Sequence, residues 1–325
     1  MNSRPYYFVL LLAVFIVFFY QNVVTAGDQV KLGGPKNISM AAIVAEKEGY
    51  FRSEGLNVES SNIQTGKVAM DALLSGNIDF AIIVDTNIAF VKFQPGSDIE
   101  IICSIGTKFD DGIVARKDKG IQSIKDLKGK TVAVTTGTTN HIFAYRLLAQ
   151  NGLEKDVKFM NLTPPAIQAS LLTGDIAAGS IWEPFRYNVM KQLNSNAVEF
   201  VDPNAYKAYA IVAVRKKYAE EHGQEIVKFL NALIRGEEFI RKHRDEAIGI
   251  LAHEMDMDKN VLKAIWKEYD VSVMLEPGML QTIKSEGKWI KETQRGFDDR
   301  PVPSYDDVVN PAFLKKIAPQ RVILK

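Results

Sequence analysis

Reactive side chains are scarce in this chain of 325 residues. It holds one cysteine, Cys103, and four histidines, at positions 141, 222, 243 and 253. A lone thiol excludes an internal disulfide and a cysteine-rich metal site, and the histidines show no metal-binding spacing. Cys103 lies inside an apolar run, so we expect its side chain to be buried as a small hydrophobic group. We therefore expect neither a metal ion nor a cofactor.

Motifs of catalysis and nucleotide binding are missing as well. Residues 129–131 read Gly-Lys-Thr, like the end of a phosphate-binding loop, but Ile124 stands where that loop requires a glycine. His253-Glu254 begins like a zinc-protease helix, yet Met257 stands where the second histidine is required. The sequence has no nucleophile elbow of the GxSxG type. It offers no catalytic constellation, so we expect a protein that is not an enzyme.

Neither sign of charge is in excess. Lys and Arg number 40, Asp and Glu number 39, and Arg4 is the only charged residue before Gly27. Nucleic-acid-binding domains carry basic patches, and this sequence has no such block. Nucleic acid is therefore not an expected partner. With 46% hydrophobic residues, the chain can bury one large core or two medium ones.

The one long hydrophobic run is at the N-terminus. Arg4 is followed by the apolar residues Phe8–Tyr20, by polar Gln21-Asn22, and by the small residues of a cleavage site. This order is typical of a secretory signal cleaved after Ala26. The alternative is an uncleaved anchor, but a spanning helix needs about 20 apolar residues and the polar pair interrupts this run. We expect a periplasmic protein without a lipid anchor, because the one cysteine, Cys103, lies far from the cleavage position.

Downstream, strand patterns alternate with helix patterns, which predicts an α/β fold with parallel sheets. Short apolar runs indicate strands, and apolar residues three and four apart indicate helices. Ser39, Thr65 and Thr138 or Thr139 stand where helix N-caps are expected. The predicted strands are residues 30–32, 78–84, 131–134 and 176–181, and the predicted helices are residues 39–48, 65–74, 140–150, 224–242, 245–255, 260–269 and 278–293.

Two segments occur twice. Leu73–Ile78 aligns with Leu171–Ile176 at an offset of 98 residues, which predicts two similar lobes. The same offset places Asp85 opposite Glu183, each directly after a buried strand. Residues 112–117 and 211–216 are also alike, since each is a short apolar strand ending in a basic pair. We expect these to be two hinge strands by which the chain leaves the first lobe and returns.

Candidate binding residues follow the predicted strands. Open α/β sheets bind ligands beyond the carboxyl ends of their strands, where helix N-termini offer free N–H groups to polar oxygens. Asn37–Ser39, Thr65-Gly66 and Gly137–Thr139 occupy such positions. Trp182 offers a flat face, and Glu183 offers a carboxylate. Each of these residues could instead be structural, as a helix cap or as packing under a loop.

Four segments carry a resemblance to a known family. Residues 45–59 read AEKEGYFRSEGLNVE, which is similar to the family pattern A-x-x-x-G-Y-F-x-x-E-G-L-x-V-E. Residues 74–81 (LSGNIDFA), 124–132 (IKDLKGKTV) and 181–184 (IWEP) have counterparts in it. These segments resemble substrate-binding proteins of ABC importers for nitrate, sulfonates, taurine and thiamine-precursor pyrimidines. The resemblance runs from about residue 31 to residue 322 in the same order.

The resemblance implies the class II periplasmic-binding-protein fold: two parallel-type sheets with flanking helices, joined by two hinge strands, with the ligand between the lobes. On this basis residues 1–26 are a signal peptide, residues 27–112 and 213–325 form lobe one, and residues 113–212 form lobe two. The implied site residues are Asn37, Ser39, Thr65, Gly66, Asp85, Thr86, Gly137, Thr138, Thr139, Trp182 and Glu183.

The resemblance also implies a function. We expect a monomer that captures a small polar organic ligand and delivers it to an ABC transporter permease. Two carboxylates facing the cleft disfavour a bare anion such as nitrate, so a sulfonate, an aminosulfonate or an aminopyrimidine is expected. One alternative is a periplasmic protein that serves a signalling receptor. Another is a thiamine-pyrimidine synthase, but those enzymes need a cysteine-rich segment and this chain has only Cys103.

Overall fold

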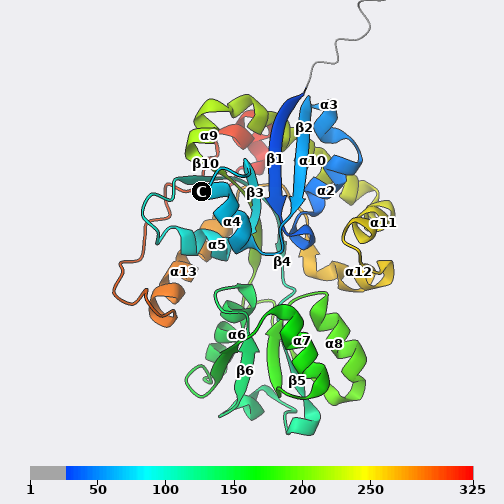
Figure 1. The fold of residues 1–325 in the computed structure, drawn as a ribbon, viewed down its shortest axis with the longest axis vertical. Helices are drawn as coiled ribbons and strands as arrows, with labels where there is room; N and C mark the ends of the chain where they lie inside the picture. Colours follow the sequence, from blue (N-terminus) through cyan, green and yellow to red (C-terminus); the bar gives the residue numbers. More distant parts are fainter. Residues whose placement is uncertain (1–26, 325) are drawn as a thin grey trace, which may run out of the picture.

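The computed structural model of the protein describes residues 27–324 and contains two β-sheets, one above the other in Figure 1. We call the six-stranded sheet with its helices lobe one and the five-stranded sheet with its helices lobe two. The strand order in lobe one is β11-β4-β10-β3-β1-β2. Its strands are β1 (Asp28–Gly34), β2 (Leu56–Asn62), β3 (Phe80–Val84), β4 (Ile99–Lys108), β10 (Ala208–Arg215) and β11 (Tyr269–Asp270).

Lobe two repeats this arrangement. Its strand order is β7-β6-β8-β5-β9, with β5 (Gly112–Arg116), β6 (Thr131–Val134), β7 (Lys158–Asn161), β8 (Ala178–Ile181) and β9 (Ala197–Phe200). In both lobes three parallel strands lie side by side, and an antiparallel strand follows the third, β10 in lobe one and β5 in lobe two. The internal repeat is therefore confirmed, while the sheets are mixed rather than purely parallel.

Helices pack around both sheets (Figure 1). Among residues 27–324, none is both long enough and apolar enough to cross a membrane. Lobe two has α6 (Thr139–Gln150), α7 (Pro164–Thr173) and α8 (Phe185–Leu193). Lobe one has α2 (Met40–Lys47), α3 (Tyr50–Ser53), α4 (Gly66–Leu74), α5 (Asp85–Val91), α9 (Lys216–Glu221), α10 (Gly223–Lys242), α11 (Arg244–Glu254), α12 (Lys259–Ile265), α13 (Pro277–Thr293) and α14 (Ala312–Ile317).

The predicted elements are all present, with ends displaced by a few residues. The largest difference is the helix expected over residues 260–269, which ends at Ile265 and is followed by a 3-10 turn and by β11. The apolar face predicted for residues 224–242 is buried in α10. There Phe229 stacks on Phe80 of β3 with 4.0 Å between ring centroids, so this face forms the core of lobe one against the sheet.

The chain passes between the lobes twice. Residues 109–111 connect β4 to β5, and residues 201–207 connect β9 to β10. The two strands expected to be hinges are regular members of the sheets, because β5 pairs with β8 and β9, and β10 pairs with β3 and β4. Their buried apolar side chains suit the centre of a sheet rather than an exposed connection. The connections lie just before these strands in the chain.

The arginine at the end of each of these strands binds one copy of the repeated segment. Arg215, at the end of β10, donates from Nη1 to the carbonyl oxygens of Leu73 (2.7 Å) and Ile78 (2.6 Å). Arg116, at the end of β5, donates from Nη1 to the carbonyl oxygen of Leu171 (2.6 Å). These oxygens lie at and just beyond helix C-termini, where carbonyl groups lack intrahelical partners. The repeated helix-end segment and the repeated strand with its basic end are therefore parts of the same arrangement, which occurs once in each lobe.

Candidate functional site

The expected binding residues of lobe one follow β1 and β2. Thr65 is the helix cap that the sequence predicts, because its Oγ1 accepts a hydrogen bond from the amide of Val68 at 3.3 Å. Gly66 lies against Asn87, whose Oδ1 would be only 2.1 Å from a Cβ atom at that position. Ser39 is not a cap, since its hydroxyl donates to a main-chain carbonyl oxygen at 2.7 Å.

The expected residues of lobe two lie at the start of α6. Gly137 has a positive φ of 77°, and its N–H donates to Nδ1 of His141 at 3.3 Å. Burial lowers the pKa of His141 to about 4, so this ring is neutral near pH 7. Thr138 donates to a main-chain carbonyl oxygen at 2.7 Å and does not cap the helix. Thr139 donates from Oγ1 to Oδ1 of Asp111 at 3.2 Å, which brings α6 to the first connection between the lobes.

Lys108 is at the centre of a buried charged cluster on that connection. Its Nζ pairs with Asp110 and lies 3.3 Å from Oδ2 of Asp111, 3.4 Å from Oγ1 of Thr139 and 5.9 Å from the centroid of a Trp182 ring. Burial acts to lower the pKa of Lys108, but the two carboxylates outweigh it and the net shift is upward. Burial raises the pKa of Asp111 to about 6. The cluster joins the end of β4 to the start of α6.

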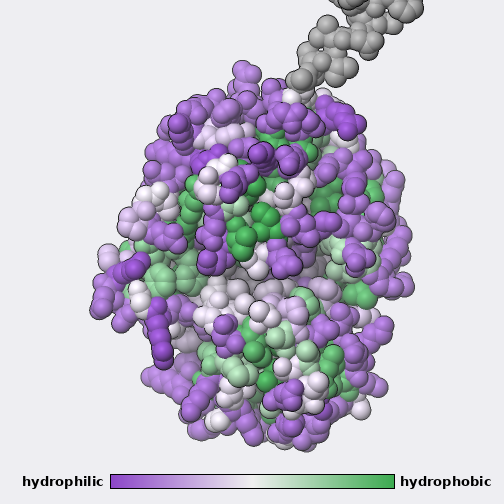
Figure 2. Space-filling view, viewed as in Figure 1, coloured by the Kyte–Doolittle hydropathy of each residue, from purple (hydrophilic) through white to green (hydrophobic). Residues whose placement is uncertain are grey.

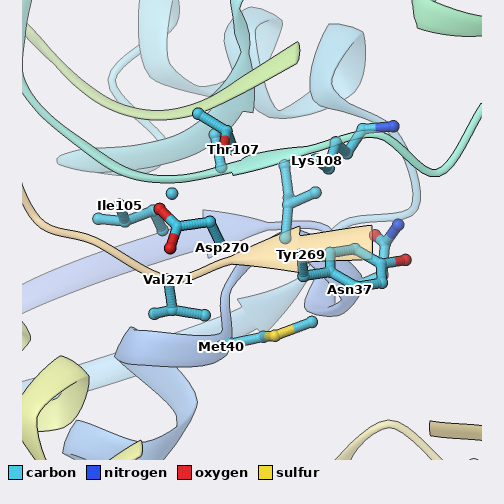
Figure 3. Close-up of a pocket in the computed structure, with 11 residues that line it drawn as sticks. Asn37, Met40, Ile105, Thr107, Lys108, Tyr269, Asp270 and Val271 are labelled. Atoms are coloured by element: carbon cyan, nitrogen blue, oxygen red, sulfur yellow. The ribbon is translucent and has the colours of Figure 1, made fainter. Parts of the chain in front are cut away.

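A small pocket lies beside this cluster (Figure 3). Its walls come from the segment before α2, the end of β4, and β11 with the residue after it. Figure 3 places Thr107 and Lys108 on one side and Met40 on the other. Of the expected site residues, this pocket contains Asn37. It is lined by Asn37, Ile38, Met40, Ile105, Gly106, Thr107, Lys108, Ala210, Tyr269, Asp270 and Val271.

Glu183 is buried and paired within its own lobe. Its Oε1 accepts from Nε of Arg186 at 2.8 Å, and its Oε2 accepts from the amide of Tyr187 at 2.8 Å. Burial raises the pKa of Glu183 to about 7, although Arg186 acts in the opposite direction. Arg186, which is buried, also pairs through Nη2 with the partly buried Glu268 of lobe one, which makes a second link between the lobes. Both oxygens of Glu183 therefore have donors from the protein itself.

Asp85 is buried as well, and three donors surround it. The amides of Thr86 (3.0 Å) and Tyr209 (2.9 Å) and the hydroxyl of Tyr206 (2.9 Å) donate to its carboxylate. Two of these donors come from the segment that returns from lobe two and from the start of β10. Asp85 and Glu183 thus occupy equivalent places in the repeat but bind different partners, and neither contacts the other.

A third contact region between the lobes involves α13, which the sequence did not mark as functional. The hydroxyl of Tyr206 also lies 2.6 Å from Oε1 of Glu286, and Arg146 of α6 donates to Ser285 of α13 at 2.6 Å. The guanidinium of Arg146 lies 5.1 Å from the Tyr206 ring centroid. Among residues 27–324, no carboxylate lies within ion-pair distance of Arg146. Trp289, one turn after Glu286, stacks edge-on against the His141 ring at 5.1 Å.

The space-filling view shows the outside of this junction. Hydrophilic side chains cover much of both lobes, while paler and hydrophobic residues gather along the waist where the lobes meet (Figure 2).

Comparison with known proteins places this architecture in a family. The family described as NMT1/THI5 like matches residues 37–247, which is more than half of the chain. The chain belongs to the NMT1/THI5-like family. The family resemblance seen in the sequence is thereby confirmed.

Several relatives of this NMT1/THI5-like protein are named as binding proteins. A Bacillus subtilis protein named for binding aliphatic sulfonates is 29% identical over 298 residues, covering 89% of this chain and 87% of the relative. The taurine-binding periplasmic protein of Escherichia coli is 26% identical over 200 residues, covering 59% of this chain and 61% of the relative. These relatives are binding proteins and not enzymes.

Solved structures confirm the two-lobed periplasmic-binding-protein fold. The alkanesulfonate-binding protein of Xanthomonas axonopodis pv. citri, bound to MOPS, matches with a TM-score of 0.72 at 19% identity, over 89% of this chain and 100% of that chain. The periplasmic aliphatic sulphonate binding protein of Escherichia coli matches with a TM-score of 0.72 at 20% identity, over 82% and 92%. At this level of identity the likeness concerns the fold.

The residues at the junction of this NMT1/THI5-like protein are suited to hydrogen bonding and charge pairing. Within the described range 27–324, no group of three His, Cys, Asp or Glu side chains is arranged to hold a metal ion. Sequence reasoning overlooked Lys108, Asp110, Asp111, Arg186 and the α13 residues. One signal was available, because residues 108–111 read Lys-Phe-Asp-Asp between two apolar strands. The role of α13 had no such signal, since only the fold brings it to α5 and α6.

Proposed function

We propose that this protein captures an organic sulfonate, with or without an amino group, between its lobes and delivers it to an ABC importer. Relatives named for aliphatic sulfonates and taurine support the ligand class. The observation that carries the proposal is that buried and partly buried polar side chains of both lobes are in contact at one junction. Lys108 meets Thr139, Arg146 meets Ser285, and Arg186 meets Glu268. A ligand held there contacts both lobes only when they are closed, so its binding favours the closed form.

The charge of the junction supports an anionic group. The sequence suggested that Asp85 and Glu183 would repel a bare anion. In the structure Asp85 has three donors of its own, and Glu183 is either protonated or paired with Arg186. Arg146 has no carboxylate partner, so it can balance the charge of a sulfonate.

The proposed site residues remain those expected from the sequence, with additions from the structure. From lobe one they are Asn37, Ser39, Thr65, Gly66, Asp85 and Thr86, and from lobe two Gly137, Thr138, Thr139, Trp182 and Glu183. We add Lys108 and Arg146, because each reaches from one lobe to the other. We also place the lobe boundaries at residues 109–111 and 201–207, a few residues before the limits 112/113 and 212/213 drawn from the sequence.

The ligand class can be tested by calorimetry on the purified mature protein. Taurine, short alkanesulfonates, an aminopyrimidine, nitrate and sulfate are titrated separately. At least one sulfonate is expected to bind with a Kd of about 1 μM, about −8 kcal/mol, and nitrate to bind far more weakly. Tight binding of nitrate or of the aminopyrimidine, with no sulfonate bound, would show that the ligand class is wrong.

The cellular place of the protein is part of the proposal. The predicted signal, residues 1–26, lies outside the residues that the structure describes. We propose cleavage after Ala26, release into the periplasm without a lipid anchor, and a monomeric state. Mass spectrometry of the periplasmic fraction should find Gly27 as the first residue, and light scattering should give the mass of one chain. Full-length chain confined to the membrane fraction would contradict this.

A further inference from the structure

Three buried polar atoms gather on the lobe-one side of the junction without hydrogen-bond partners in the described chain. They are Oγ1 of Thr86 on α5, and Oε2 of Glu286 and Nε1 of Trp289 on α13. The residues are 1%, 0% and 4% exposed, so solvent does not reach these atoms freely. A fourth such atom, Oε2 of Glu154, lies elsewhere, in the turn after α6. Buried polar atoms without partners are costly, and a group of them indicates that something else supplies the partners.

Their surroundings are those of the proposed site. Thr86 is one of its expected residues, and Trp289 packs edge-on against Phe90 of α5 (6.4 Å between centroids) and against His141 of α6 (5.1 Å). Ser285, next to Glu286, accepts from Arg146 of lobe two. The three atoms therefore lie where α5 and α13 of lobe one meet α6 of lobe two.

Counting protons fixes the state of Glu286. The Tyr206 hydroxyl lies 2.9 Å from Oδ1 of Asp85 and 2.6 Å from Oε1 of Glu286, but it has only one proton to donate. Two ionised carboxylates cannot both be satisfied by it. Asp85 already accepts from two main-chain amides, so the Tyr206 proton completes its carboxylate. Glu286 must then be a neutral acid that donates from Oε1 to the Tyr206 oxygen, which leaves Oε2 as a free acceptor.

We propose that Glu286 and Trp289, with Thr86, form a specificity-determining wall of the ligand site, and that the neutral acid of Glu286 keeps this wall uncharged for a sulfonate. This inference rests on the proposed function. The indole N–H of Trp289 and the hydroxyl of Thr86 donate to sulfonate oxygens, and Arg146 faces them from lobe two. The Oε2 atom of Glu286 accepts from a donor on the rest of the ligand. An ionised Glu286 would instead repel the anion.

The groups that face Glu286 act in both directions, and burial together with Asp85 outweighs the rest. Asp85 from α5 and the burial of the site disfavour a second negative charge, while Arg146 from α6 acts in the opposite direction. Burial is the largest cause of the pKa of Glu286 being raised well above its ordinary value. Tyr206 and Tyr305, the other two neighbours, have raised pKa values and stay protonated.

The protonation of Glu286 is tested first, on the ligand-free protein. The infrared spectrum should contain the carbonyl stretch of a buried protonated carboxylic acid, and Glu286→Gln should remove it. Glu276→Gln is the matched control. Glu276 also accepts from a tyrosine hydroxyl, that of Tyr209 at 2.6 Å, but its pKa is lowered, so its loss should leave the band unchanged. No band lost in Glu286→Gln would overturn the proposal, whatever the ligand.

The contact with ligand is tested by titration with the tightest-binding sulfonate. Trp289→Phe should weaken binding about tenfold, since it removes one hydrogen bond to a charged group. Trp266→Phe, which removes a tryptophan at the edge of lobe one, should leave the affinity for the sulfonate unchanged. Glu286→Gln should keep the affinity within about threefold, because glutamine mimics the neutral acid. Unchanged binding by Trp289→Phe would overturn the ligand contact. If no sulfonate binds wild type, the proposed function fails while the infrared result still decides the state of Glu286.

Discussion

At the scale of residues, Asp85 and Glu183 show how equivalent positions in a repeat can differ in chemistry. Asp85 accepts three hydrogen bonds and has no cation beside it among residues 27–324. Glu183 is instead paired with the buried guanidinium of Arg186. A buried carboxyl group needs one of these arrangements, because its transfer from water is otherwise costly. The choice depends on the neighbouring elements, which differ between the lobes.

Asp85 should contribute to stability through its donors. In Asp85→Asn one carboxylate oxygen is replaced by an NH₂ group, which cannot accept a hydrogen bond. At least one of the buried donors, the Tyr209 N–H or those at Oδ1, therefore loses its acceptor. We expect the free energy of unfolding to fall by about 2 kcal/mol. Urea denaturation followed by circular dichroism measures this change. Asp71→Asn, which alters an exposed pair with Lys67, is the control and should change stability by less than about 0.5 kcal/mol. Equal effects of the two substitutions would contradict the role of Asp85.

The raised pKa values predict how stability depends on pH. Burial raises the pKa of Glu183 to about 7 and that of Asp111 to about 6, while in the unfolded chain these groups titrate near about 4. Between about pH 4 and pH 7 these two carboxyl groups therefore bind more protons in the folded state, and together they outweigh the opposite effect of His141. The free energy of unfolding should fall as pH rises through this window. Glu183→Gln cannot titrate, so its profile should be flatter between about pH 5 and pH 7. A profile as steep as that of wild type would contradict this assignment.

At the scale of elements, the antiparallel strand beside the third parallel strand has the same task in both lobes. Arg215 at the end of β10 and Arg116 at the end of β5 each bind carbonyl oxygens at the helix turn before that third strand. Free carbonyl groups at helix ends need such donors. The arginines thereby fix each helix to the strand that follows it.

Removal of one of these arginines should weaken its own lobe. Arg215→Met keeps much of the apolar stem but loses the hydrogen bonds to Leu73 and Ile78 and the contact with Asp79 at 3.3 Å. We expect a loss of about 2 kcal/mol in the free energy of unfolding. Lys217→Met is the control. The Lys217 side chain is 81% exposed, and its Nζ lies as far as 3.8 Å from Oε1 of its partner Glu221, so the pair should contribute little to stability. Hydrogen exchange should show the loosening in α4 and β3, and protection unchanged in these elements would count against the role of Arg215.

At the scale of the whole molecule, polar links between the lobes accompany the two chain connections. Arg186 binds Glu183 in its own lobe and Glu268 in lobe one, so it links the residues after β8 to the turn just before β11. This pair therefore adds to the contacts that hold the two lobes together in the structure.

Loss of the cross-lobe pair should shift the balance towards an open form. Glu268→Gln removes the charge that Arg186 meets in lobe one, and we expect sulfonate binding to weaken about tenfold. Small-angle scattering should give a larger radius of gyration for the ligand-free variant than for the ligand-saturated one. Glu199→Gln is the control, because Glu199 lies 3.9 Å from Arg186 within the same lobe. Identical scattering curves with and without ligand, for wild type and variant, would contradict closure.

Much of the site could not be read from the sequence, and the physical reason is the separation of its parts along the chain. The helix start at Thr65 was predictable, because a capping residue acts on the next few amides. The pairing of Tyr206 with Glu286 joins residues 80 positions apart, and that of Arg146 with Ser285 joins residues 139 apart. No local pattern specifies such contacts.

The sequence by itself determined the order of helices and strands, the internal repeat and the family, because these depend on periodicity, caps and motifs that are local. The tertiary structure decided which strands run antiparallel, where the chain crosses between lobes, and that β10 lies at the centre of a sheet rather than in a hinge. It also decided which donors surround the carboxyl groups of Asp85 and Glu183. The charge state of a buried carboxyl group depends on the donors and cations that the fold brings to it, and these come from distant parts of the chain.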